Sequence, residues 1–101
     1  MKVLVVGAGG VGSAAVGIAA RRSFFSAMVV ADYDVGRAQR AIAHHSDDGR
    51  FVAAHVDASS ADAVAALCRQ HGITHVLNAV DPRFVMPVFE GAFAAGADYL
   101  D

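Results

Sequence analysis

Short apolar runs alternate along the chain with longer segments in which apolar residues recur every three or four positions. Uninterrupted apolar runs are typical of strands buried on both faces of a sheet, whereas the longer spacing is typical of helices. The pattern predicts strands at residues 2–6, 27–31, 51–56, 75–79 and 98–100, and helices at residues 10–22, 35–44, 60–72 and 87–95.

This alternation predicts an α/β fold of the Rossmann type, a doubly wound parallel sheet with helices on both faces. Right-handed crossovers and a glycine-rich first turn favour the strand order 3-2-1-4-5. A six-stranded fold of this class would continue past Asp101. We therefore expect residues 1–101 to be one domain, the N-terminal fragment of a longer protein that is truncated before further strands and a substrate domain. Such a fragment would expose apolar surface and could form a homo-oligomer.

The helical spacing also predicts which side chains face the sheet. In the third predicted helix these are Val64, Leu67 and Cys68. In the first predicted helix they are Val11, Ala14, Ala15, Ile18 and Ala19.

Composition narrows the possible functions. Hydrophobic residues make up 55% of the chain and charged residues 18%, which excludes a disordered protein. The net charge is −2 and no basic run exceeds Arg21–Arg22, so we expect no nucleic-acid partner. No apolar run approaches the roughly 20 residues of a membrane span. Cys68 is the only cysteine and cannot form an intrachain disulfide, which is consistent with a reducing, cytoplasmic location.

The residues after the first strand, Gly7-Ala8-Gly9-Gly10-Val11-Gly12, fit the pattern G-x-G-x-x-G. In a dinucleotide-binding fold the first glycine permits the tight turn and the second lets the backbone approach a pyrophosphate. The third allows the helix to pack closely on the sheet. The free N–H groups at the start of that helix then meet the phosphates.

An acidic residue at the end of the second strand strengthens this interpretation. Asp32 stands 20 residues after Gly12, where the motif places the acid that binds the adenosine ribose. Its charge would repel a 2′-phosphate, so NAD is the preferred cofactor. Asp34 is a poorer candidate for the ribose because it lies past the strand end. Arg37 could help to neutralise a 2′-phosphate, so NADP remains possible.

Two further strand ends point to the same edge, where open α/β sheets bind ligands. Asp57 follows the third strand, near the expected position of an adenine, although it could equally be a turn residue. Asn78, Ala79 and Val80 end the fourth strand, beside the expected pyrophosphate and nicotinamide. Asn78 could instead satisfy buried backbone groups.

Other chemistry has little support. The pairs His44–His45 and His71–His75 have no additional cysteine or carboxylate partners, so we expect no metal site. No G-x-S-x-G pattern accompanies Ser13, so a serine nucleophile is not indicated.

The stretch HVLNAVDPRFVMPVFEGAFAAGADYLD, together with the opening KVLVVGAGGVG, resembles the N-terminal NAD(P)-binding domain of the saccharopine dehydrogenase and saccharopine reductase family. The resemblance covers essentially the whole chain. It implies an oxidoreductase that transfers hydride between a nicotinamide cofactor and the C–N bond of an amino-acid-derived substrate. The family's substrate domain follows the region that this chain spans, so the catalytic residues are unknown and the fragment alone is expected to bind cofactor without catalysis. Several family members use NADP and carry a basic residue where this chain has Asp32–Tyr33.

Two other functions remain open at this point. One is a non-catalytic nucleotide-sensing module, a class that shares the glycine turn and the acid after the second strand. Such modules do not usually carry the Asn-Ala-Val-Asp-Pro and Tyr-Leu-Asp segments found here. The other is a domain that has kept the fold, has lost the ligand and serves only in assembly.

Overall fold

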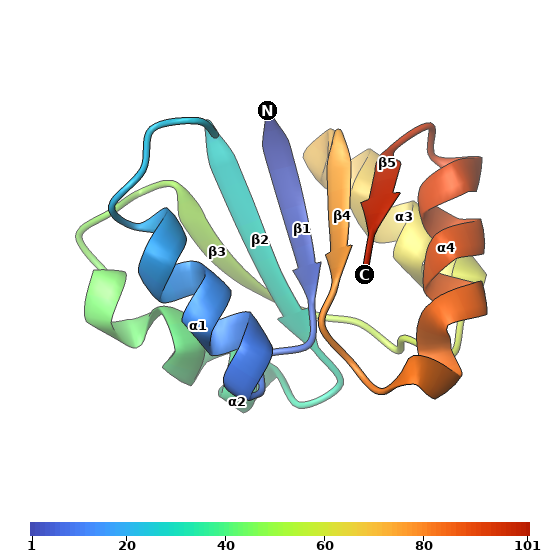
Figure 1. Ribbon diagram of the computed structural model, residues 1–101, viewed down its shortest axis with the longest axis horizontal. Coiled ribbons are helices and arrows are strands. Elements are labelled where there is room, and N and C mark those ends of the chain that lie inside the picture. Colours follow the sequence, from blue (N-terminus) through green and yellow to red (C-terminus); the bar gives the residue numbers. More distant parts are fainter.

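A computed structural model describes residues 1–101 and contains a five-stranded sheet with four α-helices (Figure 1). In chain order the elements are β1 (Lys2–Val6), α1 (Gly10–Ala19), β2 (Ala27–Asp32), α2 (Val35–Ile42), β3 (Phe51–His55), α3 (Ala61–His71), β4 (His75–Asn78), α4 (Val85–Ala94) and β5 (Asp98–Leu100). Two short 3-10 helices, Ala43–His45 and Pro82–Phe84, follow α2 and precede α4.

The sheet is parallel throughout, and its strand order is β3-β2-β1-β4-β5, as the sequence predicts. The chain moves outward from β1 to β3, crosses back over the sheet, and continues outward through β4 and β5. The strand order therefore reverses between β1 and β4, whose carboxyl ends lie side by side at the lower end of the sheet as drawn in Figure 1. A reversal of this kind leaves a crevice between the diverging loops, where ligands of open α/β sheets bind.

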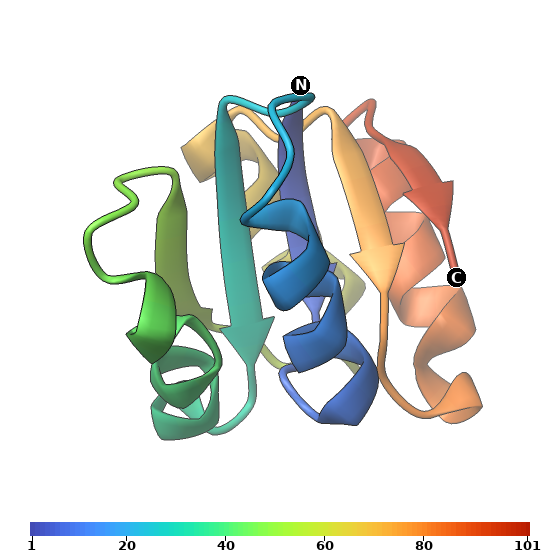
Figure 2. The ribbon, with the colours of Figure 1, turned by 60° about the vertical axis from the view of Figure 1, so that its left-hand side comes forward.

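Helices cover the two faces of the sheet in pairs, with α1 and α2 on one face and α3 and α4 on the other (Figure 2). Alternate residues of one strand supply the two cores. In β1, Leu4 and Val6 pack toward α3 and α4, whereas Val3 and Val5 pack toward α1 and α2. Burial on both faces explains why the strands have no polar alternation.

The predicted face of α1 is mostly wrong, because only Ala19 of its five residues is buried, whereas the predicted face of α3 is confirmed. Val11 and Ile18 are 69% and 54% exposed, and α1 instead buries Gly12, Val16 and Ala19. These three residues share one side of the helix because they are four and three positions apart. The missing side chain at Gly12 lets this line approach the sheet. In α3, Val64, Leu67 and Cys68 are buried as expected.

Helix ends follow local capping chemistry. The hydroxyl of Ser60 accepts a hydrogen bond from the Ala63 N–H at the start of α3, and Gly72 ends that helix with a φ of 64°. The first helix ends at Ala19 rather than at residue 22. The N–H groups of Arg21 and Arg22 bond to carbonyls of the last turn and close it.

Arg50 connects three segments beside the sheet. Its guanidinium forms an ion pair of 2.7 Å with Asp48 and donates to the carbonyl of Arg22 at 2.7 Å. It also lies 4.1 Å from the centre of the Phe25 ring, in cation–π geometry. Hydrogen bonds from Arg50 hold the pKa of Asp48 at about 2, below its ordinary value of 3.8.

Because the pKa of Asp48 is lowered by folding, its contribution to stability is present above pH 4 and is lost as the pH falls from about 4 to about 2. We expect the variant Asp48→Asn to be less stable than the wild type at pH 7. The difference should shrink as both proteins are acidified through this range. Urea unfolding at a series of pH values measures it, with the exposed neighbour variant Asp47→Asn as a control. A difference that stays constant down to pH 2 would contradict the assignment.

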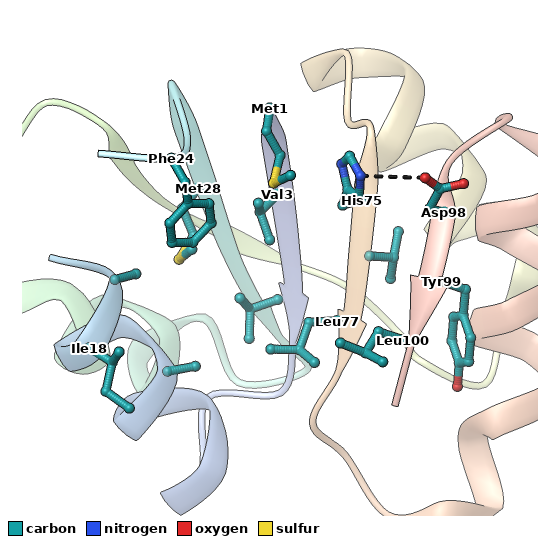
Figure 3. A pocket seen from close by; sticks show the side chains of 14 residues that line it. Met1, Val3, Ile18, Phe24, Met28, His75, Leu77, Asp98, Tyr99 and Leu100 are labelled. Atoms are coloured by element: carbon teal, nitrogen blue, oxygen red, sulfur yellow. Dashed lines mark ion pairs between the residues drawn. The ribbon is translucent and has the colours of Figure 1, made fainter. Parts of the chain in front are cut away.

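The face that α1 and α2 cover is left open over β4 and β5. An apolar hollow of about 490 Å³ lies there, and Figure 3 shows its floor and rim. Leu77 forms part of the floor, Phe24 and Leu100 are more than half exposed, and an ion pair of 3.4 Å between His75 and Asp98 marks one rim.

No helix in the structure combines the length and hydrophobicity that a bilayer crossing requires.

Candidate functional site

A cleft of about 610 Å³, in which half of the lining residues are hydrophobic, lies at the carboxyl edge of the sheet. Its size falls within the range of small-molecule and cofactor sites. Loops after β1, β2, β3 and β4 contribute its walls. The lining residues are Val6, Gly7, Gly9, Asp32, Tyr33, Arg37, Val56, Asp57, Ala58, Ser59, Ala79, Val80, Asp81 and Phe84.

The glycine turn forms one wall of this cleft, and its glycines have different structural roles. Gly7 has a φ of +104°, which side chains rarely permit. A Cβ on Gly12 would lie 1.9 Å from the carbonyl oxygen of Gly7, so only glycine lets α1 begin this close to β1. A Cβ on Gly9 would meet no atom within 4 Å and would project into open space. Gly7 and Gly12 are therefore required for the shape of the turn. Gly9 leaves the backbone at the surface of the turn uncovered by a side chain.

The start of α1 is free of side-chain caps. Its N-cap residue is Gly9, which has no side chain that could cap the helix, and the first turn has no acidic residue. By contrast, Asp34 caps α2 and Ser60 caps α3. The N–H groups at the start of α1 are thus available to an anion, which the positive end of the helix dipole would also stabilise.

Asp32 connects the glycine turn to the end of β2. One carboxylate oxygen accepts a hydrogen bond of 2.9 Å from the Ala8 N–H, and the other accepts one of 2.9 Å from the Asp34 N–H. A carboxylate offers about four acceptor positions, so capacity remains for two hydroxyl groups. Asp32 thereby fixes the turn and still presents negative charge to the cleft.

Asp57 lies across the cleft at the end of β3. One of its oxygens accepts hydrogen bonds from the Ser59 hydroxyl at 2.6 Å and from the Ser59 N–H at 3.0 Å. These bonds lower the pKa of Asp57, because they stabilise the charged carboxylate. The second oxygen has no protein donor in the structure.

Asn78 is buried, and both ends of its amide are used inside the protein. Its nitrogen donates to the Tyr99 hydroxyl at 3.0 Å, and its oxygen accepts from the Val80 N–H at 3.1 Å. It therefore holds β5 against β4 and shapes the loop after β4. Burial raises the pKa of Tyr99, so its hydroxyl stays protonated at neutral pH.

The loop after β4 borders the cleft beside the glycine turn. A Cβ on Gly7 would lie only 2.5 Å from the Val80 side chain, so the two loops are in tight contact. Beside them, the Asp81 carboxylate accepts the Arg83 N–H at 2.9 Å, which lowers the pKa of Asp81.

The structure brings some of the residues expected from sequence to the cleft and places others beside it. Gly7, Gly9, Asp32, Asp57, Ala79 and Val80 line the cleft, whereas Gly10, Val11, Gly12 and Asn78 do not. Ser59, Asp81 and Phe84 also line it but were not expected from sequence to do so. The nearness of Ser59 and Asp81 to strand ends is a signal that could have indicated them. No sequence signal indicates Phe84, because its position at the cleft depends on the 3-10 turn.

These residues fit a dinucleotide. N–H groups without a side-chain cap lie at the start of α1, next to the uncovered backbone of Gly9. The Asp32 carboxylate at the end of β2 has acceptor positions to spare. The cleft extends from there to the ends of β3 and β4. A bound dinucleotide would bring its own reactive group, and these residues would supply position and charge.

Comparison with solved structures supports the fold. The apo form of a histidine-tagged saccharopine dehydrogenase (L-Glu forming) from Saccharomyces cerevisiae is similar, with a TM-score of 0.78 and 17% identity. The similarity covers 97% of this chain and 20% of that one. Quinate dehydrogenase from Corynebacterium glutamicum, solved in complex with NAD, has a TM-score of 0.58 and 25% identity, over 99% of this chain and 43% of that one. The chain thus spans less than half the length of either enzyme.

Sequence comparison identifies the family. No curated protein sequence gives a significant match. The profile of the family described as "Saccharopine dehydrogenase NADP binding domain" matches residues 3–101, which is nearly the whole chain. This match confirms the resemblance seen in the sequence, and the chain belongs to the saccharopine dehydrogenase NADP-binding domain family.

Proposed function

We propose that this chain is the cofactor-binding domain of a saccharopine dehydrogenase-like oxidoreductase, with NAD as its preferred cofactor. The reaction would transfer hydride to or from the C–N bond of an amino-acid-derived substrate. Family membership supports the reaction class. The residues that select and position the substrate would belong to another part of the enzyme, so these 101 residues alone should bind cofactor without turnover.

The observation that carries the cofactor proposal is the link between Asp32 and the glycine turn. The Ala8 N–H bond places a carboxylate beside the bare backbone of Gly9. Pyrophosphate would lie against the N–H groups at the start of α1, and the ribose hydroxyls would donate to Asp32. In this arrangement Gly7 and Gly12 fix the turn, and Gly10 and Val11 contribute N–H groups.

The remaining cleft residues take secondary roles. The free oxygen of Asp57 would accept a hydrogen bond from the adenine amino group. Ala79 and Val80 would cover the middle of the cofactor. Asn78 lies outside the cleft and would position the loop after β4 through its hydrogen bonds to Tyr99 and to the Val80 N–H. The charge of Asp32 favours NAD, since a 2′-phosphate would meet it directly.

Titration calorimetry with NAD and NADP tests the proposal. We expect the wild type to bind NAD more tightly than NADP. In Asp32→Ala, NAD affinity should fall at least about tenfold, because hydrogen bonds to a charged acceptor are lost. NADP affinity should fall less, since removing the charge also removes a repulsion.

The exposed acid Asp47, outside the cleft, provides the control variant Asp47→Asn, which should bind both cofactors as the wild type does. Equal losses of NAD and NADP in Asp32→Ala would count against the ribose contact. Tighter binding of NADP by the wild type would refute the stated preference. Absence of binding by either cofactor at millimolar concentration would indicate a domain that serves only in assembly.

A further inference from the structure

A chain of hydrogen bonds runs from the cleft to the carboxyl end of β5. The Val80 N–H donates to the Asn78 side-chain oxygen at 3.1 Å, and the Asn78 side-chain nitrogen donates to the Tyr99 hydroxyl at 3.0 Å. The Tyr99 hydroxyl in turn donates to an Asp101 carboxylate oxygen at 3.1 Å. We infer that Tyr99 and Asp101 are positioning residues, which hold the loop after β4 in place for the nicotinamide half of the cofactor. This inference rests on the proposed dinucleotide site.

Each bond in this chain can run in only one direction. A backbone N–H can only donate, so it fixes the side-chain oxygen of Asn78 toward Val80 and the nitrogen toward Tyr99. An ionised carboxylate can only accept, so the single proton of the Tyr99 hydroxyl points to Asp101. Burial raises the pKa of Tyr99, and the Asp101 carboxylate adds to the rise, which keeps this proton on the hydroxyl at neutral pH. Removal of the hydroxyl would leave a donor of the buried Asn78 side chain without its partner.

The surrounding packing holds the Tyr99 hydroxyl in this position. β4 and β5 pair in register, with Val76 beside Tyr99 and Leu77 beside Leu100. The Tyr99 ring packs edge-on against Phe89 of α4, with ring centres 5.5 Å apart. Figure 3 shows the Tyr99 hydroxyl directed toward the carboxyl end of β5, the end at which the loop after β4 also begins. The hydroxyl can therefore act on that loop through Asn78 without entering the cleft itself.

The loop that this chain holds borders only one part of the cleft. Ala79 and Val80 line the cleft at the end of β4, whereas Asp32 lines it at the end of β2. In the proposed arrangement the adenosine ribose lies at Asp32 and the pyrophosphate lies at the glycine turn. The loop after β4 then meets the part of the cofactor beyond the adenosine. A shift of this loop should weaken the binding of NAD and leave the binding of AMP almost unchanged.

A purely structural role for Tyr99 makes a different prediction. Tyr99 could serve only to hold β5 on β4, as the ion pair of 3.4 Å between His75 and Asp98 does at the other end of the same strands. Loss of either connection would then have the same effect on cofactor binding. Asp98→Ala is therefore the matched control, because the Asp98 side chain is exposed and does not line the cleft.

Calorimetry with NAD and AMP tests the inference. Tyr99→Phe removes the hydroxyl and keeps the ring that packs on Phe89. We expect its NAD affinity to fall about fivefold, the equivalent of one hydrogen bond, and its AMP affinity to fall less than about twofold. Asp101→Ala should weaken NAD binding about threefold, because the Tyr99 hydroxyl loses its acceptor. Asp101→Asn retains an acceptor oxygen and should bind NAD as the wild type does. Asp98→Ala should leave the affinity for both ligands unchanged.

Urea unfolding shows which variants are folded under the assay conditions. If Tyr99→Phe does not fold, Asp101→Ala decides the question, because it alters only an exposed side chain. An unchanged ratio of NAD to AMP affinity in the folded variants of Tyr99→Phe and Asp101→Ala would overturn the inference. An equal change of that ratio in Asp98→Ala would also overturn it. In both cases NAD binding by the wild type would leave the proposed function intact. Wild-type protein that binds neither NAD nor AMP would refute the proposed function and the inference together.

Discussion

Replacing Gly12 by alanine is expected to destabilise the domain by about 3 kcal/mol or more, at the upper end of overpacking costs. The added Cβ would lie 1.9 Å from the Gly7 carbonyl oxygen, a backbone atom that cannot rotate away. The start of α1 would have to separate from β1, which disturbs the buried contacts of Val16. Because domains of this size are stable by only about 5–15 kcal/mol, the loss is large. Thermal or urea unfolding measures it.

Gly9→Ala is the informative comparison, since it alters the same motif without a clash. The new methyl group would enter open space, and the φ of −76° at Gly9 suits alanine. Stability should fall by less than about 1 kcal/mol, the difference between glycine and alanine as N-caps. NAD binding should nevertheless weaken, because the methyl group covers the bare backbone. If Gly9→Ala and Gly12→Ala proved equally destabilising, the division of roles within the motif would be wrong.

Gly91→Ala is expected to destabilise the domain by about 1–3 kcal/mol, although alanine favours helix formation. A Cβ at this position in α4 would lie 2.6 Å from the Cβ of Val64 and 2.7 Å from the Ala61 carbonyl oxygen, both in α3. Close contact between α3 and α4 depends on this missing side chain. Forcing the helices apart costs more than the roughly 1 kcal/mol gained from helix propensity.

Gly17→Ala separates these two effects. Gly17 lies inside α1, and a Cβ there would meet no atom within 4 Å. Only the propensity gain remains, so this variant should be more stable than the wild type by about 0.5–1 kcal/mol. Urea unfolding of both variants provides the test, and a stabilised Gly91→Ala would contradict the packing argument.

Some features of the candidate site could be predicted from the local sequence, whereas others depend on contacts between distant parts of the chain. The spacing from Gly7 to Gly12, and from there to Asp32, is local and could be read from the sequence. The hydrogen bond between Ala8 and Asp32 joins residues 24 positions apart, so it depends on β1 and β2 being neighbours. The use of Asn78 by Tyr99 likewise depends on β4 pairing with β5.

By itself, the sequence determined the elements, the parallel sheet and its strand order, because apolar periodicity and turn chemistry act over a few residues. The tertiary structure alone decided which face of α1 is buried, since docking along Gly12 excludes the more apolar side that carries Val11 and Ile18. It also decided the contact of Gly91 with Val64 and the enclosure of Arg50 by three segments. These contacts join residues far apart in the chain, and their energies depend on distances that are set only when the helices and strands pack together.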